Sequence, residues 1–191
     1  MEIGGAVILI NAGTLVETLI SNGLALDKYK KIIDDVKHTD VSTDTEFQKT
    51  FNHFYKVRRN ENWRKIYYKL FEDSKSNSVL NFEEILLHLY RETHQIEPSF
   101  SSKLLATLNP DMPIWDQYVL RNLGLELKGS NKEERLCNAV KLYDNIIEWY
   151  KEFLGTDNAK ECLHLFRSAT QNYQWLTDTK IIDYIICGMR Q

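Results

Sequence analysis

The sequence has little glycine and proline, and both are unevenly placed. No glycine occurs from Leu24 to Leu123, and all three prolines lie between Pro98 and Pro113. A β-rich domain of that length needs glycine in its tight turns, whereas helices can be joined through polar capping residues. The missing glycines also exclude a P-loop or a dinucleotide-binding turn in this stretch, because such turns bring backbone amides close to phosphates.

Cysteine is also scarce, and no long hydrophobic run is present. The three cysteines, Cys137, Cys162 and Cys187, are odd in number and have no CxxC spacing, which is typical of reduced thiols in a cytosolic protein. The apolar run 3–10 is too short to span a bilayer and has no basic residues before it, which argues against a signal peptide. We therefore expect a cytoplasmic protein without membrane association.

Length and charge favour an ordinary globular protein. The chain has 191 residues, 43% of them hydrophobic and 27% charged, and its net charge of −3 does not by itself indicate a nucleic-acid or membrane binder. The five histidines are scattered, and no HExxH, GxSxG or EF-hand pattern occurs. The sequence therefore predicts one domain covering 1–191, with no metal and no other cofactor.

Capping signals followed by apolar stripes of helical period predict helices along the chain. The residue pairs with capping-box spacing are Thr14 and Glu17, Thr43 and Glu46, Asn81 and Glu84, and Ser130 and Glu133. The stripes that follow lie at 47–54, 63–70, 85–90, 136–154, 163–173 and 181–186, with Gly155 as the C-cap of the longest. We interpret 6–10 as a buried first helix, with a strand as the alternative. The predicted fold is a single all-α globular domain of about nine or ten helices. We expect the proline cluster to be an irregular loop flanked by helices, and not a domain boundary.

A basic and aromatic stretch runs from Phe47 to Lys75. It holds eight Lys or Arg residues against three acidic ones, although the chain as a whole is acidic. Arg64 and Tyr68 are four residues apart, and we expect them to share an exposed helix face. Such a face could grip phosphates, with arginine supplying a fork of donors. The alternative is a solvated helix surface whose aromatic residues belong to the core. The candidate phosphate contacts in this stretch are Arg58, Arg59, Arg64 and Lys65.

A second segment carries the sharper signal. The chain reads NPDMPIWDQYVLRNLGL from Asn109 to Leu125, so that a proline turn and two apolar residues precede Asp116. Asp116 is a candidate N-cap of a helix that Gly124 ends. At that position a carboxylate accepts backbone N–H bonds and lies at the positive end of the helix dipole, and both effects favour its charged form.

This segment resembles the region around the catalytic aspartate of the helix-hairpin-helix DNA glycosylases, the superfamily of the adenine and thymine-glycol base-excision enzymes. Their signature is Pro, two apolar residues, Asp, two variable residues, Val or Ile, one variable residue and Arg. Pro113, Asp116, Val119 and Arg121 occupy those places here. The resemblance implies an all-α fold, double-stranded DNA as the partner, and base flipping. It also implies that Asp116 stabilises the cationic sugar of the transition state or activates a water, with Arg121 among the DNA-binding residues.

The match departs from the family at several places. The family's hairpin carries two glycines that hold DNA phosphate, but the equivalent stretch 94–103 has none, and the iron–sulfur cysteines of some members are absent. In bifunctional members a lysine near the hairpin attacks the sugar and forms a Schiff base. Lys103 is the one nearby candidate for that catalytic role, although it lies closer to Asp116 than the family's spacing, and its alternative role is that of a surface lysine.

Two functions therefore stay open. The first is a DNA glycosylase-like protein that binds DNA and excises a base through Asp116, with activity either retained or lost. The second is a non-catalytic all-α interaction or regulatory protein, in which the same residues are helix caps and solvated surface. The sequence names neither the target base nor a protein partner.

Overall fold

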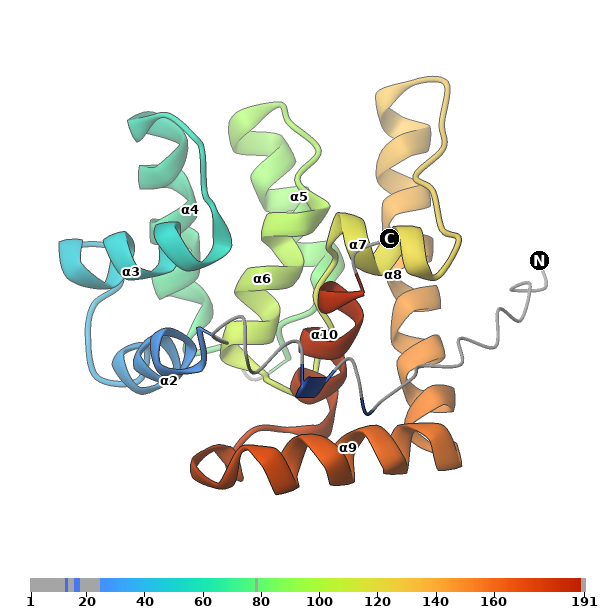
Figure 1. Ribbon diagram of the computed structural model, residues 1–191. Coiled ribbons are helices and arrows are strands. Elements are labelled where there is room, and N and C mark those ends of the chain that lie inside the picture. The colour runs from blue at the N-terminus through green and yellow to red at the C-terminus, as the bar shows by residue number, and fades with distance from the viewer. Residues whose placement is uncertain (1–12, 14–15, 18–24, 78, 190–191) are drawn as a thin grey trace. The chain divides into compact units, whose positions relative to one another are not determined.

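The computed structural model describes residues 13, 16–17, 25–77 and 79–189 (Figure 1). Within these ranges the chain forms nine α-helices and one short 3₁₀ helix, and no strand. The all-α class predicted from the sequence is therefore confirmed. The predicted first helix at 6–10 lies outside the described residues, and so does Thr14, the predicted N-cap of a later helix. None of the helices in these ranges combines the length and apolar character needed to cross a lipid bilayer.

The contacts divide the chain into two compact units. The central unit comprises Ala25–Asn109, and the terminal unit joins Met1–Leu24 with Pro110–Gln191. The division falls next to Pro110, inside the proline cluster, where we expected no boundary. Pro98 of the same cluster does not lie in a loop, because it is the first residue of the helix Pro98–Leu108. That residues 1–191 form one domain stays a prediction.

The central unit contains five helices. In chain order they are α2 (Leu26–Asp35), α3 (Thr45–Tyr55), α4 (Glu61–Ser74), α5 (Phe82–Thr93) and α6 (Pro98–Leu108). Helix α2 packs against α3 and α6, and α5 packs against both α4 and α6.

Aromatic side chains of α3 and α4 fill the core of the central unit. The ring of Phe51 lies 5.5 Å from that of Phe71 and 6.0 Å from that of Tyr67, between ring centroids. The two predicted stripes therefore do face the core. The expectation that Tyr68 shares an exposed face with Arg64 is wrong, since Tyr68 is only 1% exposed and its hydroxyl donates to Asn52 Oδ1 at 2.8 Å.

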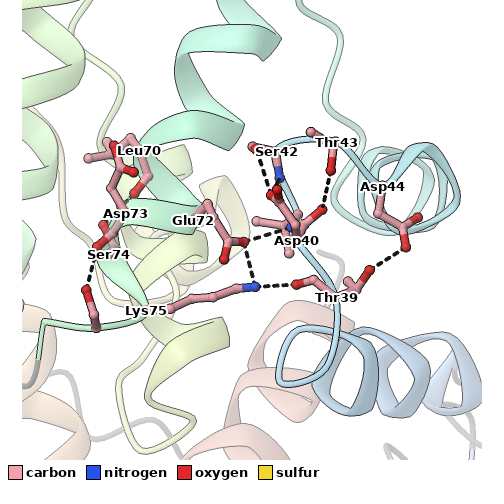
Figure 2. A network of polar contacts seen from close by, with 12 residues as sticks. Thr39, Asp40, Ser42, Thr43, Asp44, Leu70, Glu72, Asp73, Ser74 and Lys75 are labelled. Atoms are coloured by element: carbon pink, nitrogen blue, oxygen red, sulfur yellow. Dashed lines mark hydrogen bonds and ion pairs between the residues drawn. The ribbon is translucent and has the colours of Figure 1, made fainter.

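A polar network ties the α2–α3 connection to the end of α4 (Figure 2). The amide of Val41 donates to Glu72 Oε2 at 2.8 Å, and Lys75 pairs with the same carboxylate at 2.6 Å. Lys75 Nζ also donates to the carbonyl of Thr39. Glu72 and Lys75 thus attach the α2–α3 connection to the end of α4. Lys75, one of the cations of the basic stretch, therefore makes contacts within the fold.

The terminal unit contains four α-helices and the 3₁₀ helix. In chain order they are α7 (Gln117–Asn122), α8 (Lys132–Leu154), α9 (Asp157–Ala169), η1 (Gln171–Tyr173) and α10 (Asp178–Gly188). Helix α10 contacts α7, α8 and α9, and its four isoleucines are fully buried. The stripe predicted at 163–173 is therefore split, because α9 ends at Ala169.

The predicted helix caps are partly right. Asn81 caps α5 by accepting from the amide of Glu84 at 3.0 Å. The predicted caps Thr43 and Ser130 are wrong by one residue, because Asp44 and Asn131 cap α3 and α8. Asp is a stronger N-cap residue than Thr, which explains why Asp44 displaces Thr43. Ser130 instead uses its hydroxyl to bond Glu134 Oε2 at 2.6 Å.

Candidate functional site

Asp116 is the N-cap of α7, as predicted. Its backbone is extended, and Oδ1 accepts from the amide of Tyr118 at 2.9 Å. The side chain is half-buried. In the described part of the chain, the other oxygen, Oδ2, accepts no hydrogen bond. One oxygen of the carboxylate is thus fixed by the first turn of the helix.

Gly124 ends α7, also as predicted. Its φ of +65° places it in the left-handed region, where glycine is favoured. The amide of Leu125 donates to the carbonyl of Leu120 at 2.8 Å, and that of Gly124 donates to Arg121 at 3.1 Å. These two bonds form a Schellman motif, which satisfies carbonyls at the end of the helix.

Buried side chains of α8 and α10 hold the loop before Asp116. The hydroxyl of Tyr143 donates to the carbonyl of Pro113 at 2.7 Å, and the amide of Ile114 donates to Asp183 Oδ1 at 3.4 Å. Since that carbonyl and that amide belong to one peptide group, the group is bonded at both its polar atoms. Thr177 Oγ1 adds a bond to the carbonyl of Pro110 at 2.7 Å.

Asp183 is the centre of this buried network. Its Oδ1 accepts from the hydroxyl of Tyr150 at 2.7 Å, and its Oδ2 accepts from Lys180 Nζ at 2.8 Å. The side chains of Lys180 and Asp183 are 4% and 2% exposed. Burial raises the pKa of Asp183, and the Lys180 cation opposes that effect. Burial also raises the pKa of Tyr150, so its hydroxyl stays protonated and serves as a donor.

Arg59 is paired inside the central unit. Its Nε and Nη2 donate to the two carboxylate oxygens of Glu97, each at 2.9 Å, and Glu97 is only 5% exposed. The guanidinium also lies 5.8 Å from the Trp63 ring and 5.3 Å from the Phe100 ring. The fork of donors that was expected to contact phosphate is thus occupied by a buried carboxylate.

The other basic residues of the stretch differ in their pairing. Lys65 pairs with Glu61 at 2.8 Å, in a fully solvated setting on α4. Lys49, Lys69 and Lys75 also pair with carboxylates. Three cations make no ion pair with any described residue, and they are Lys56, Arg58 and Arg64. Lys56 and Arg58 are exposed, and Arg64 is partly exposed.

Lys103 is not a surface lysine. It is 8% exposed on α6, where its Nζ donates to Ser99 Oγ at 3.0 Å. The same nitrogen lies 5.4 Å from the Phe100 ring and 5.7 Å from the Tyr55 ring. The structure thus brings Lys103 and Arg59 to the same aromatic ring.

Arg121 lies on the last turn of α7, five residues beyond Asp116. It is exposed, and its guanidinium lies 5.8 Å from the Tyr118 ring. Asp116 and Arg121 both belong to the terminal unit. The other predicted site residues belong to the central unit, and they are Arg58, Arg59, Arg64, Lys65 and Lys103.

The sequence analysis missed Tyr143, Lys180 and Asp183. The apolar stripe at 136–154 predicts that Tyr143 faces the core, but it does not predict a hydrogen bond from its hydroxyl. Lys180 and Asp183 are three residues apart within a helix that is otherwise rich in isoleucine. Opposite charges at that spacing lie on one helix face, and their occurrence among isoleucines is the signal that could have found them.

Within the described ranges, no three His, Cys, Asp or Glu side chains gather as they would around a metal ion. No protein-family model, curated protein sequence or solved structure matches this chain.

Proposed function

We propose that this chain binds double-stranded DNA and acts as a DNA N-glycosylase, with Asp116 as the catalytic carboxylate. The support comes from the resemblance of the segment around Pro113, Asp116, Val119 and Arg121, and from the all-α fold of the described residues. The observation that carries the proposal is the state of Asp116. One carboxylate oxygen is fixed by the Tyr118 amide, and the other accepts no hydrogen bond from the described residues.

The chemistry that suits such a carboxylate is cleavage of a glycosidic bond. The bond between the sugar carbon and the base nitrogen breaks, and the electron pair and a proton go to the leaving base. Positive charge develops on the sugar ring, and a nearby ionised carboxylate stabilises it. A water then adds its oxygen to the sugar carbon and releases a proton, which leaves an abasic site.

The expected DNA contacts follow from the pairing of the basic residues. Lys56, Arg58 and Arg64 form no ion pairs with described residues, so they can neutralise phosphates without first breaking an internal pair. We therefore assign the main phosphate contacts of the central unit to these three. Arg59 and Lys65 contribute less, because Glu97 and Glu61 already neutralise them.

The test is base release from a panel of damaged and mismatched duplexes by the wild type and by Asp116→Asn. Asn caps a helix about as well as Asp, so the variant keeps α7 and loses the charge. We expect the melting temperature to change little, while base release falls by about 10²-fold or more, the usual cost of losing one electrostatic group. A wild type that releases no base from any substrate refutes the enzyme proposal.

A second candidate is a non-catalytic interaction protein. The observation that favours it is the pairing of five of the eight basic residues of the 47–75 stretch with carboxylates. In that case Asp116 serves only as a cap of α7. This candidate predicts no duplex binding at low salt and no base release.

A further inference from the structure

The loop that ends at Asp116 is held by an unusual arrangement of buried polar groups. Tyr143 and Asp183 bond the carbonyl and the amide of a single peptide group, the one between Pro113 and Ile114. We call this arrangement the peptide clamp. Tyr143 is fully buried and Asp183 is 2% exposed, so both bonds lie away from water.

The stability of the terminal unit does not explain the clamp well. A buried ion pair such as Lys180 with Asp183 loses much of its attraction to desolvation, and apolar residues of similar size often serve stability equally well. Asp183 accepts three hydrogen bonds, which satisfy its oxygens. The neighbouring residues in the sequence of α10 are nevertheless mostly isoleucines, so the charged pair stands in an apolar helix. What the arrangement does provide is a fixed acceptor for the amide of Ile114.

The clamp lies close to Asp116 in the chain. Only Ile114 and Trp115 separate the clamped peptide from Asp116, and Trp115 is 5% exposed, so this short link is itself packed. At the other end of α7, Asn122 Nδ2 donates to the carbonyl of Ile186 on α10 at 2.9 Å. The segment that carries Asp116 is thus attached to α10 on both sides.

We infer that Tyr143 and Asp183 are positioning residues, which clamp the Pro113–Ile114 peptide and thereby fix the Asp116 carboxylate for catalysis. This inference rests on the proposed function for its chemical meaning. A misplacement of about 1 Å in a catalytic group can lower a rate by about 10²-fold. The gain in rate from a rigid support for Asp116 can therefore outweigh the cost in stability of burying the Lys180–Asp183 pair.

The test compares Tyr143→Phe with Tyr68→Phe. Both variants delete one hydroxyl from a buried tyrosine, but Tyr68 lies in the central unit and bonds Asn52. Amide hydrogen exchange of the segment 110–118 should become about tenfold faster in Tyr143→Phe, because one buried hydrogen bond is lost. It should be unchanged in Tyr68→Phe. Base release by Tyr143→Phe should show a kcat lowered by about tenfold or more with KM within about twofold.

A second variant separates the hydrogen bond from the charge. Lys180→Met with Asp183→Asn removes both buried charges and keeps an oxygen that can accept from the Ile114 amide. We expect exchange in 110–118 to stay slow in this double variant, while Lys180→Met with Asp183→Leu, which lacks the acceptor, exchanges faster.

The outcomes are distinct. Unchanged exchange in 110–118 for Tyr143→Phe overturns the clamp, whatever the activity. Faster exchange with an unaltered kcat overturns the positioning role. A wild type without base release refutes the proposed function, and the exchange data then still decide whether the clamp holds the Asp116 segment.

Discussion

Replacing both Arg58 and Arg64 with glutamine removes two of the three cations of the 47–75 stretch that make no ion pair with a described residue. Each phosphate neutralised by a protein cation contributes about −0.9 to the slope of log affinity against log salt. Three such contacts give a slope of about −2.7, and the single remaining cation, Lys56, gives about −0.9.

These slopes convert into affinities that can be measured. Between 50 and 200 mM salt, these three contacts alone should lower the duplex affinity of the wild type by about 40-fold, and the one contact left in the double variant should lower it by only about 3.5-fold. At the lower salt concentration the variant should also bind more weakly. Fluorescence anisotropy of a labelled duplex at several salt concentrations measures both quantities.

The matched control is Lys49→Gln with Lys65→Gln. It lowers the net charge by the same two units, but it removes cations that already pair with Glu46 and Glu61. We expect its salt slope to stay close to that of the wild type. An equal reduction of the slope in both variants would show that net charge alone governs binding, and absence of wild-type binding at low salt would refute the nucleic-acid interface.

Two further predictions concern the fold. Gly124→Ala should lower the free energy of unfolding by about 1 kcal/mol, measured by chemical denaturation. The added Cβ meets no atom within 4 Å, so the cost is that of the left-handed backbone alone. An unchanged denaturation midpoint would contradict the Schellman motif at the end of α7. Burial raises the pKa of Cys162 to about 11, so at pH 8 about 0.1% of it is thiolate, and iodoacetamide should label the exposed Cys137 well before Cys162. Equal labelling of the two in the native protein would show that α9 is not packed as described.

The sequence was a good guide to the helices because their apolar stripes face the core. The stripe of α8 is an example, since Leu136, Ala139, Tyr143, Ile146 and Tyr150 are all buried. Helix starts were less certain, because two capping residues often stand side by side. In the case of α8, Glu134 reaches back to Ser130 at 2.8 Å while Asn131 is the actual cap. The capping-box pattern therefore predicted the start of α8 to within one residue, but it named Ser130 instead of Asn131 as the cap.

The candidate site was harder to predict, because its geometry depends on contacts distant in sequence. The pairing of Arg59 with Glu97 spans 38 residues, and no local pattern indicates it. Lys103 is buried because all residues from 101 to 107 of α6 are buried, which covers every face of the helix there. The hydroxyl groups in this stretch donate to backbone carbonyls of the preceding turn. Thr107, for example, donates to the carbonyl of Lys103 one turn earlier. A helix of this kind has no exposed face on which a lysine could lie.

The central claim is that the charge of Asp116 stabilises a cationic sugar, and it can be tested without knowing the target base. Two duplexes are compared, one with a positively charged pyrrolidine in place of a single sugar and the other with a neutral tetrahydrofuran. The wild type should bind the charged analogue at least about 10²-fold more tightly, as expected for a transition-state mimic. Asp116→Asn should lose this preference. Equal affinity of the wild type for the two duplexes would contradict the claim.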